Sequence, residues 1–189
     1  PRLSPDGQWI SWVSNGALQV CSWDGSDHRI LVESEADITW AVCDFIAAEE
    51  LNRSRGYWWL PDSSGLMVQR TDDTPVPIWH RSDPANPQRE PAQQRYPHAG
   101  AANALVEVWR FDLDGEGTRV PLPEAEYLAT VRGGAIGVFD RAQTALTVCD
   151  FDGQTIGRVE QQPWLDLVPG LPRRSGDVLV AWTDEARRR

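Results

Sequence analysis

The sequence has no lysine: all 18 of its basic residues are arginine. With 28 acidic residues among 189, the formal net charge is −10 at pH 7. This balance argues against nucleic acid as a partner, because nucleic-acid binding relies on a positive surface. An acidic surface instead favours the attraction of cationic ligands.

Long apolar runs are also missing, and none approaches the roughly 20 residues that a membrane-spanning helix requires. The chain opens with Pro1 rather than an initiator methionine, so we expect it to be part of a longer polypeptide. Hydrophobic residues make up 41% of the sequence, with ten tryptophans, which indicates a folded protein with a substantial core.

Cysteine is scarce. Cys21, Cys43 and Cys149 are odd in number and have no C-x-x-C spacing. They predict neither a disulfide framework nor a zinc site, and we expect buried free thiols. Unpaired thiols favour a reducing compartment such as the cytoplasm, although the compartment is left open. No motif predicts a cofactor.

What the sequence does contain is a repeated pattern of short strands and tight turns. Asp6-Gly7, Asn15-Gly16 and Asp24-Gly25 are turn signals. They separate β-prone runs at residues 9–13, 18–23 and 29–32. Strand, turn, strand within about 30 residues is typical of a propeller blade, so we predict an all-β protein of four-stranded antiparallel meanders.

The same pattern returns later in the chain. A second opening turn at residues 60–65 precedes a strand at 66–70, and residues 106–111 form another. Successive strands are expected at 127–131, 135–139 and 145–151, with a turn at Asp152-Gly153. The repeats lie roughly 45 to 60 residues apart, near the period of blades with insertions. Residues 82–95 are interpreted as a surface loop, and residues 178–182 as the start of another strand pair.

One segment does not fit the strand pattern. Residues 42–52 are predicted to form a helix, because Val42, Phe45, Ile46 and position 49 fall at i, i+3, i+4 and i+7. Position 49 is Glu49, followed by Glu50, so a carboxylate occupies the last position of the apolar stripe. We therefore expect Glu49 to point toward the protein.

Three motifs occur in one order along the chain: DFIAAEE with GYWW at residues 44–50 and 56–59, DDTPVP at 72–77, and YPHAGAAN at 96–103. Together they resemble the dipeptidyl peptidase IV family of the prolyl oligopeptidase clan. The resemblance covers nearly the whole chain. It implies about half of an eight-bladed propeller, which in the family packs on an α/β-hydrolase domain.

By this resemblance the chain divides into a first blade region (1–40), a Glu-bearing helical insertion (41–56), a middle blade region (57–126) and a last, incomplete region (127–189). Glu49 and Glu50 match the glutamates that bind the N-terminal ammonium of a peptide substrate. The implied enzyme is a serine exopeptidase that releases dipeptides, with Pro or Ala expected at the second position. Its other partner is the α/β-hydrolase domain of the same polypeptide.

Two alternatives stay open. Glu49 and Glu50 could instead pair with Arg53 at helical i+4 and i+3 spacing, an interaction that contributes only about 0.2–0.5 kcal/mol. The whole chain could also be a non-enzymatic propeller that serves as a protein-interaction scaffold. Carboxylates facing the central cavity would favour the peptidase, and carboxylates facing solvent the scaffold.

The sequence offers no catalytic residues of its own. It has no G-x-S-x-G nucleophile motif, and His28, His80 and His98 are scattered singly. The DLDG and DFDG segments at 112–115 and 150–153 resemble calcium loops but lack the later acidic ligand, so hairpin turns are predicted. Gly133-Gly134 is also interpreted as a turn.

The adjacent Trp58 and Trp59 should lie on opposite faces of a strand, with at least one in the core between blades. A partial ring would also leave strand edges open near Leu3 and residues 178–182. We therefore expect the isolated chain either to associate as a homo-oligomer or to be poorly ordered at its ends.

Overall fold

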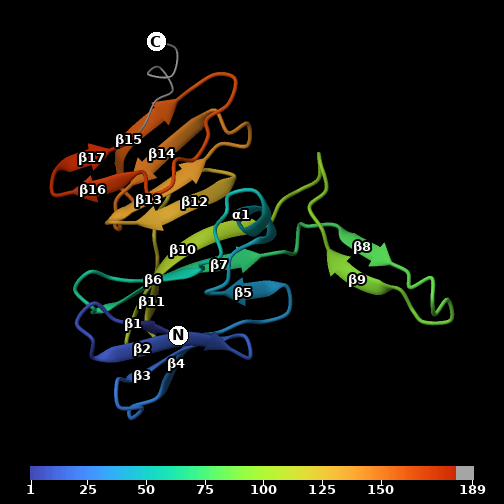
Figure 1. The fold of residues 1–189 in the computed structure, drawn as a ribbon, viewed down its shortest axis with the longest axis horizontal. Helices are drawn as coiled ribbons and strands as arrows, with labels where there is room; N and C mark the ends of the chain where they lie inside the picture. Colours follow the sequence, from blue (N-terminus) through green and yellow to red (C-terminus); the bar gives the residue numbers. More distant parts are fainter. Residues whose placement is uncertain (182–189) are drawn as a thin grey trace.

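The computed structural model describes residues 1–181. Three antiparallel sheets follow one another along the chain and are stacked face to face (Figure 1). The first is a four-stranded meander in the order β1-β2-β3-β4. Its strands are β1 (Arg2–Leu3), β2 (Trp9–Ser14), β3 (Ala17–Ser22) and β4 (Arg29–Glu33). Asn15 and Gly16, with φ of 52° and 77°, form the turn between β2 and β3 that the sequence predicted.

The second sheet has an interrupted edge strand. Its order is β11-β10-β7-β5, and β6 pairs with β7 as well. Its strands are β5 (Ile38–Trp40), β6 (Tyr57–Trp59), β7 (Gly65–Asp72), β10 (Leu105–Asp112) and β11 (Gly117–Arg119). Because β5 and β6 pair with successive parts of β7, they share one edge position, and the helix α1 (Phe45–Glu49) lies in the insertion between them.

The third sheet is again a regular meander, β12-β13-β14-β15. Its strands are β12 (Tyr127–Arg132), β13 (Ala135–Phe139), β14 (Ala145–Cys149) and β15 (Thr155–Glu160). A hairpin of β16 (Arg173–Ser175) and β17 (Val178–Val180) follows it. This is the additional strand pair predicted near the C-terminus, although Trp182, the last residue expected in it, lies outside the described residues.

The sheets confirm the predicted all-β meanders, with α1 as the helix of the described chain. Two details of the sequence prediction are wrong. The sheets begin at Arg2, Ile38 and Tyr127, so the spacing between them is uneven rather than the roughly 45 to 60 residues expected of blade repeats. In addition, β5 belongs to the second sheet, although the first blade region was predicted to include residues 1–40. The insertion at 41–56 and a second, longer excursion between β7 and β10 cause the unevenness.

That second excursion is a hairpin, not the plain loop expected at 82–95. β8 (Ile78–Arg81) pairs with β9 (Ala92–Arg95), and together they form an arm that extends away from the sheets (Figure 1). The residues of β8 are all exposed. The AQQR sequence of β9 has no β-branched or aromatic residue, so only its pairing with β8 reveals it as a strand.

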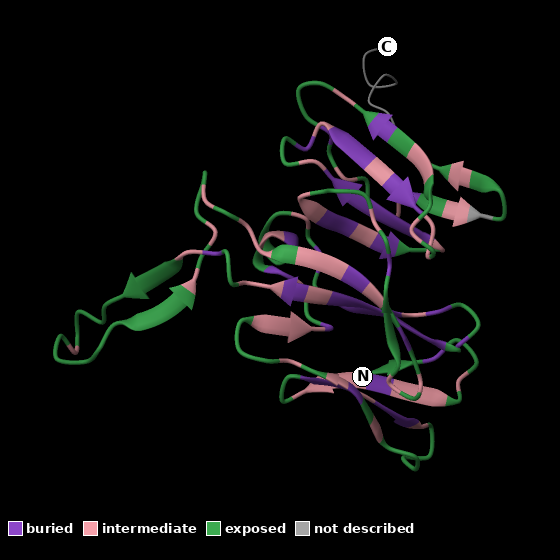
Figure 2. Ribbon diagram, turned by 180° about the vertical axis from the view of Figure 1, so that it is seen from behind, coloured by how far each residue is buried: buried purple, intermediate pink, exposed green. Residues whose placement is uncertain are grey.

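Two apolar layers hold the sheets together (Figure 2). Trp58 packs in the layer that joins the second and third sheets, and Trp59 packs against the layer that joins the first and second. Alternation along a strand places successive side chains on opposite faces, so the prediction for this tryptophan pair is confirmed. Trp58 and Trp59 therefore anchor the C-terminal end of the insertion in both apolar layers.

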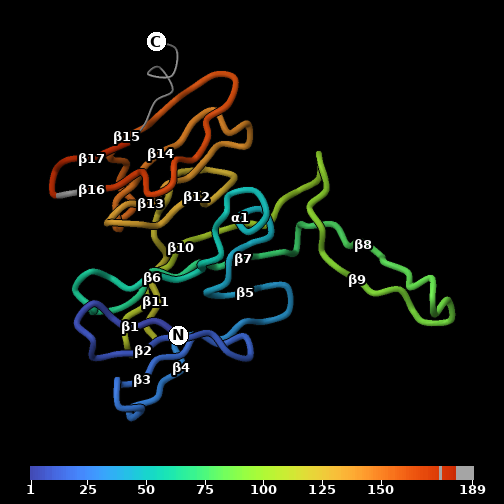
Figure 3. Tube along the Cα trace, viewed as in Figure 1, coloured from blue at the N-terminus to red at the C-terminus, as the bar shows by residue number. Residues whose placement is uncertain are grey.

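All three sheets present their first strand at a common edge: β1, then β5 with β6, then β12. The chain trace shows the insertion looping out from this edge between the second and third sheets (Figure 3). Helix α1 contacts β12, the first strand of the next sheet. The insertion therefore emerges from the edge strand position of one sheet and lies against the edge strand of its neighbour.

Candidate functional site

The helix that carries the candidate carboxylates is short because both of its ends are fixed. Asp44 caps the N-terminus, with its Oδ2 accepting a hydrogen bond from the backbone N–H of Ala47 at 3.0 Å. Asn52, with φ of 50°, cannot continue a right-handed helix. The observed helix is Phe45–Glu49, with Glu50 at its C-cap, rather than residues 42–52.

The apolar stripe does not face the core as predicted. Val42 and Phe45 are 43% and 39% exposed, and the buried residue of the helix is Ala47. The ring of Phe45 meets that of Tyr96 edge-on, 5.4 Å between centroids. The stripe prediction is wrong because the helix buries Ala47, while Phe45 turns toward Tyr96 at the root of the arm.

Glu49, the last position of that stripe, is therefore exposed, and so is Glu50. The expectation that Glu49 points into the protein is wrong. The alternative in which the pair is neutralised by Arg53 is also contradicted, because Arg53 pairs with Asp44. Among the described residues, neither glutamate has an ion-pair partner.

Arg53 is instead the centre of a buried network beneath the helix. Its Nη2 lies 3.2 Å from Asp44 Oδ1, and both side chains are more than nine-tenths buried. Its Nη1 donates to Gln69 Oε1 at 2.7 Å, and Gln69 Nε2 donates in turn to Asp44 Oδ1 at 2.9 Å. Burial lowers the pKa of Arg53, while the Asp44 carboxylate opposes that effect.

The same guanidinium also joins two sheets. Arg53 Nη2 donates to the backbone carbonyl of Leu128 on β12 at 3.0 Å, and its Nη1 donates to the carbonyl of Arg55 at 2.6 Å. The guanidinium carbon lies 5.8 Å from the centroid of the Trp58 ring. Buried charges are tolerated when they are paired and hydrogen-bonded in this way. The network locks the glutamate helix onto both neighbouring sheets.

The two ends of the insertion close on one residue of the central strand. The N–H of Ala41 donates to the carbonyl of Gln69 at 2.9 Å, and the N–H of Gln69 donates to the carbonyl of Gly56 at 2.7 Å. A Cβ added at Gly56 would lie 2.3 Å from the carbonyl carbon of Ala41. The close approach requires glycine, so the GYWW motif begins with the residue that permits the loop to close.

Beside the helix lies a groove of about 480 Å³ whose lining includes Glu50, Arg53 and Trp58. Its other wall is formed by β12 and by residues 164–171 beyond β15. Glu50 therefore stands at the mouth of a cavity between two sheets. A paired carboxylate beside such a cavity can hold a cation by charge-assisted hydrogen bonds.

The two downstream motifs surround the root of the arm. Arg95 pairs with Asp37, 2.8 Å between Nη2 and Oδ2, and its Nη1 donates to the carbonyl of Val76 at 2.7 Å. Farther on, Asn103 Nδ2 donates to Glu126 Oε1 at 2.7 Å, which ties the YPHAGAAN segment to the start of the third sheet. These contacts hold Tyr96, and with it Phe45, in place.

The comparisons with known proteins agree with this architecture. The profile of the "Dipeptidyl peptidase IV (DPP IV) N-terminal region" matches residues 1–162. The chain belongs to this family. Human dipeptidyl peptidase 8 is 29% identical over 148 residues, which cover 68% of this chain and 16% of that protein. A putative dipeptidyl aminopeptidase of Schizosaccharomyces pombe is 28% identical over 121 residues, covering 59% and 15%.

A solved structure shows the same fold for this dipeptidyl peptidase IV N-terminal region. The crystal structure of Porphyromonas gingivalis dipeptidyl peptidase 4 superposes with a TM-score of 0.75 at 19% identity, covering 88% of this chain and 26% of that one. The chain thus spans less than a fifth of the curated relatives named above, and it corresponds to a partial β-propeller.

Other sequence candidates take structural roles in this propeller. In both Asp-Gly loops one aspartate caps its own turn: Asp112 Oδ1 accepts from the N–H of Glu116, and Asp150 Oδ1 from that of Gln154, each at 2.9 Å. Gly133-Gly134 is the β12–β13 turn. The cysteines are free, with Cys21 and Cys149 buried and Cys43 partly so. In the described part of the chain, no three His, Cys, Asp or Glu residues gather as a metal site.

Within residues 1–181, no helix is long and apolar enough to cross a bilayer. Asp44 and Gln69 were not predicted from the sequence as part of the site. Asp44 directly precedes the helix, which is an N-cap signal that could have been used. Nothing in the sequence around Gln69 indicates its role. That role arises only because β5 and β6 both pair with β7, which brings the two ends of the insertion to Gln69.

Proposed function

We propose that this chain is the substrate-gating and N-terminus-recognising part of a dipeptidyl-peptidase-IV-like serine exopeptidase. In this proposal Glu49 and Glu50 bind the ammonium group of a peptide, and the Ser, Asp and His of the catalytic triad belong to an α/β-hydrolase domain elsewhere in the polypeptide. Fixing the ammonium at a set distance from the nucleophile would measure out two residues, which makes the enzyme release dipeptides.

One observation carries the proposal: the two carboxylates are left without an internal cation although a guanidinium lies in the same insertion. Arg53 is held below the helix by Asp44 and Gln69. Glu50 borders the groove between two sheets. A free pair of carboxylates on a rigidly anchored helix is suited to bind a cation from outside.

The competing function is a propeller that only binds other proteins. Such a protein would use the helix only as part of its binding surface, and its binding would not require the two carboxylates. The burial of the Arg53 network favours the peptidase, because an interaction surface alone gives no reason to bury an ion pair beneath one short helix. Family membership in the dipeptidyl peptidase IV N-terminal region supports the same choice.

The test is made on the full-length polypeptide with paired substrates. A chromogenic Xaa-Pro or Xaa-Ala dipeptide substrate with a free N-terminus should be cleaved, and its N-acetylated form should not. Glu49→Gln or Glu50→Gln keeps the side-chain shape and removes the charge. Since hydrogen bonds to charged groups contribute about 1.5–3 kcal/mol, each change should lower kcat/KM roughly 10- to 100-fold or more.

Glu124→Gln is a matched control, because Glu124 is exposed and has no ion-pair partner among the described residues. It should leave kcat/KM unchanged. Unchanged kinetics in the Glu49 and Glu50 variants, with a lowered melting temperature, would mean that the pair only braces its helix. Absence of cleavage of either substrate by the wild-type polypeptide would favour the scaffold.

A further inference from the structure

Three arginines from three different elements line one groove at the common edge of the sheets. Arg2 comes from β1, Arg55 from the end of the insertion, and Arg132 from the end of β12. The groove has a volume of about 550 Å³. The rest of its lining is proline, glycine, tryptophan and other apolar residues, and no described aspartate or glutamate contributes to it.

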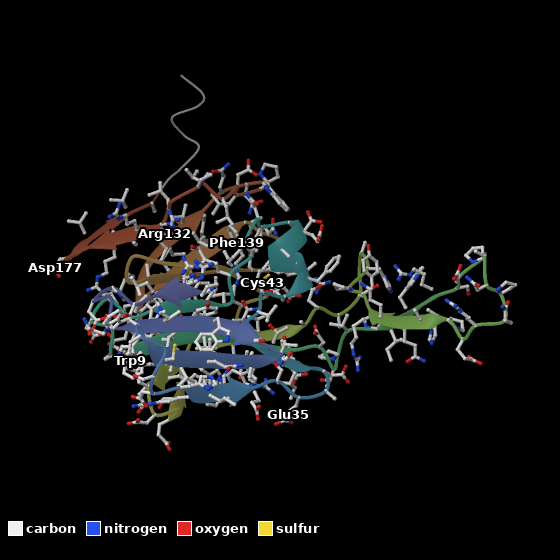
Figure 4. All side chains as sticks on the ribbon, turned by 60° about the horizontal axis from the view of Figure 1, so that its bottom comes forward. Trp9, Glu35, Cys43, Arg132, Phe139 and Asp177 are labelled. Carbon is white, nitrogen blue, oxygen red and sulfur yellow. The ribbon has the colours of Figure 1, made fainter. Side chains whose placement is uncertain are left out.

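These guanidinium groups differ from most arginines in the described part of the chain. Arg29, Arg95 and Arg158, for example, each pair with a carboxylate at 2.6–2.8 Å. Within residues 1–181, neither Arg55 nor Arg132 has an ion-pair partner, and the Nε of Arg55 is buried without a hydrogen-bond partner. Figure 4 shows Arg132 on the third sheet, on the side toward the first two sheets.

The groove is also electrostatically unusual in a chain of net charge −10. Burial lowers the pKa of Arg55, and the positive charges of Arg2 and Arg132 lower it further, while Tyr57 acts in the opposite direction. Arg2 is held over the ring of Tyr57, 5.8 Å from its centroid. Repulsion among like charges is unfavourable, and an anion bound between them would relieve it.

We infer that the groove lined by Arg2, Arg55 and Arg132 is a binding site for an oxyanion, either the carboxylates of an acidic peptide or a phosphate group. The guanidinium group presents planar pairs of N–H donors that match carboxylate and phosphate oxygens. Trp58 and Trp59 also line the groove, and charge-assisted hydrogen bonds are stronger beside apolar surface than in open water. The Nε of Arg55 also has no hydrogen-bond partner within the fold.

This site is separate from the carboxylate pair but adjoins it. The groove beside Glu50 and the arginine groove share Arg55, Trp58, Val131 and Arg132 in their linings. Glu50 does not line the arginine groove. A ligand without an ammonium group should therefore bind to the arginines whether or not Glu49 and Glu50 recognise substrate, and the two assignments can fail independently.

Isothermal titration of the full-length polypeptide tests the site with two probes: inorganic pyrophosphate, and an N-acetylated, C-amidated tetraglutamate that cannot use the glutamate pair. We expect at least one probe to bind and its affinity to fall as salt rises. The combined change Arg2→Gln, Arg55→Gln and Arg132→Gln should weaken binding roughly 10- to 100-fold or more. Binding of pyrophosphate alone would identify a phosphate ligand, and binding of tetraglutamate alone an acidic peptide.

The matched control is Arg110→Gln, Arg119→Gln and Arg158→Gln, which removes the same charge from arginines that are 46%, 60% and 55% exposed. It should leave the affinity within about twofold, since exposed ion pairs contribute little. If the groove variant fails to fold, Arg132→Gln alone, on an exposed side chain, should still weaken binding. Binding of neither probe, or equal losses in the groove and control variants, would overturn the inference.

Discussion

Arg53 lies 3.2 Å from Asp44, and this pair joins the two sides of the insertion on which the glutamates stand. Asp44 caps the start of the helix through Oδ2 and receives Arg53 through Oδ1. The same arginine bonds to the carbonyl of Leu128 in the next sheet. The orientation of Glu49 and Glu50 thus depends on a buried charge pair that neither glutamate contacts.

Removing one member of this pair should be costly. Arg53→Met leaves the Asp44 carboxylate buried without a cation, which costs about 3–5 kcal/mol in comparable buried pairs. Hydrogen exchange of the full-length polypeptide should then accelerate at residues 41–56 before it does so in the second sheet. Arg158→Met, which breaks an exposed pair with Glu160, should change stability by no more than about 1 kcal/mol. Unchanged exchange in the Arg53 variant would mean that the pair does not anchor the insertion.

Gly56→Ala should act on the same segment by a different route. The added methyl group would lie within 2.5 Å of three backbone atoms of Ala41 and Val42, so the ends of the insertion must separate. We expect the hydrogen bond from the Ala41 N–H to the Gln69 carbonyl and that from the Gln69 N–H to the Gly56 carbonyl to weaken. The loss of N-terminus recognition should exceed the loss of stability in the sheets. The measurement is kcat/KM for the free-amine substrate together with the melting temperature.

Gly25→Ala is its control, because open space surrounds Gly25 while its φ of 84° gives the substitution a backbone cost of about 1–2 kcal/mol. Substrate recognition should be unaffected there. Equal kinetics in the two variants would show that closure of the insertion does not matter for the glutamates.

The strand pattern could be predicted from the sequence because local chemistry determines it. Asn15-Gly16 takes the two positive φ values that a tight hairpin needs, and β2 and β3 pair on either side of it. The position of the helix could also be predicted, but its length could not. A periodic stripe gives no sign that Asn52 will adopt a left-handed conformation or that Ala47 will be the buried residue of the helix.

The candidate site was predictable only in part, for a related reason. Glu49 and Glu50 stand together in the sequence, and the motif identifies them. Their support comes from Gln69 and Leu128, which lie far along the chain and meet Arg53 only when three segments are packed. The three arginines of the groove are likewise 53 and 77 residues apart in sequence (55 − 2 and 132 − 55). Contacts of this kind have no local signature.

Asp73 provides a pH-dependent test of the packing at the root of the arm. Burial raises the pKa of its carboxyl above the ordinary 3.8, with Asp44, Asp37 and Asp72 acting in the same direction and Arg95 opposing them. The native state therefore holds the proton more tightly than the unfolded state, and stability decreases as pH rises from 3.8 through the folded pKa. Asp73→Asn should be more stable than the wild type at pH 7, and the difference should shrink in acid.

Thermal unfolding at a series of pH values measures this difference. Asp72→Asn is the comparison, because hydrogen bonds from Thr74 lower the pKa of Asp72 and its ionised form is the stabilising one. That variant should be less stable than the wild type at pH 7. A destabilised Asp73→Asn at pH 7 would contradict the assignment of burial as the dominant influence on Asp73.

The isolated 189-residue chain should associate, because the stack of sheets leaves its ends uncovered. Leu3 on β1, Ile30 on β4 and Val178 on β17 are 60%, 52% and 61% exposed. Strand edges with free N–H and C=O groups invite pairing with another chain, and a covering propeller would hide them.

Size-exclusion chromatography with light scattering should show a dimer or larger species whose fraction rises with concentration. Leu3→Lys and Val178→Lys together should reduce that association, since charged side chains protect strand edges. The control Glu124→Lys, at an exposed position, should not reduce it. A sharp monomer at every concentration, with slow hydrogen exchange at both ends, would show that these residues close by themselves and would count against the partial ring.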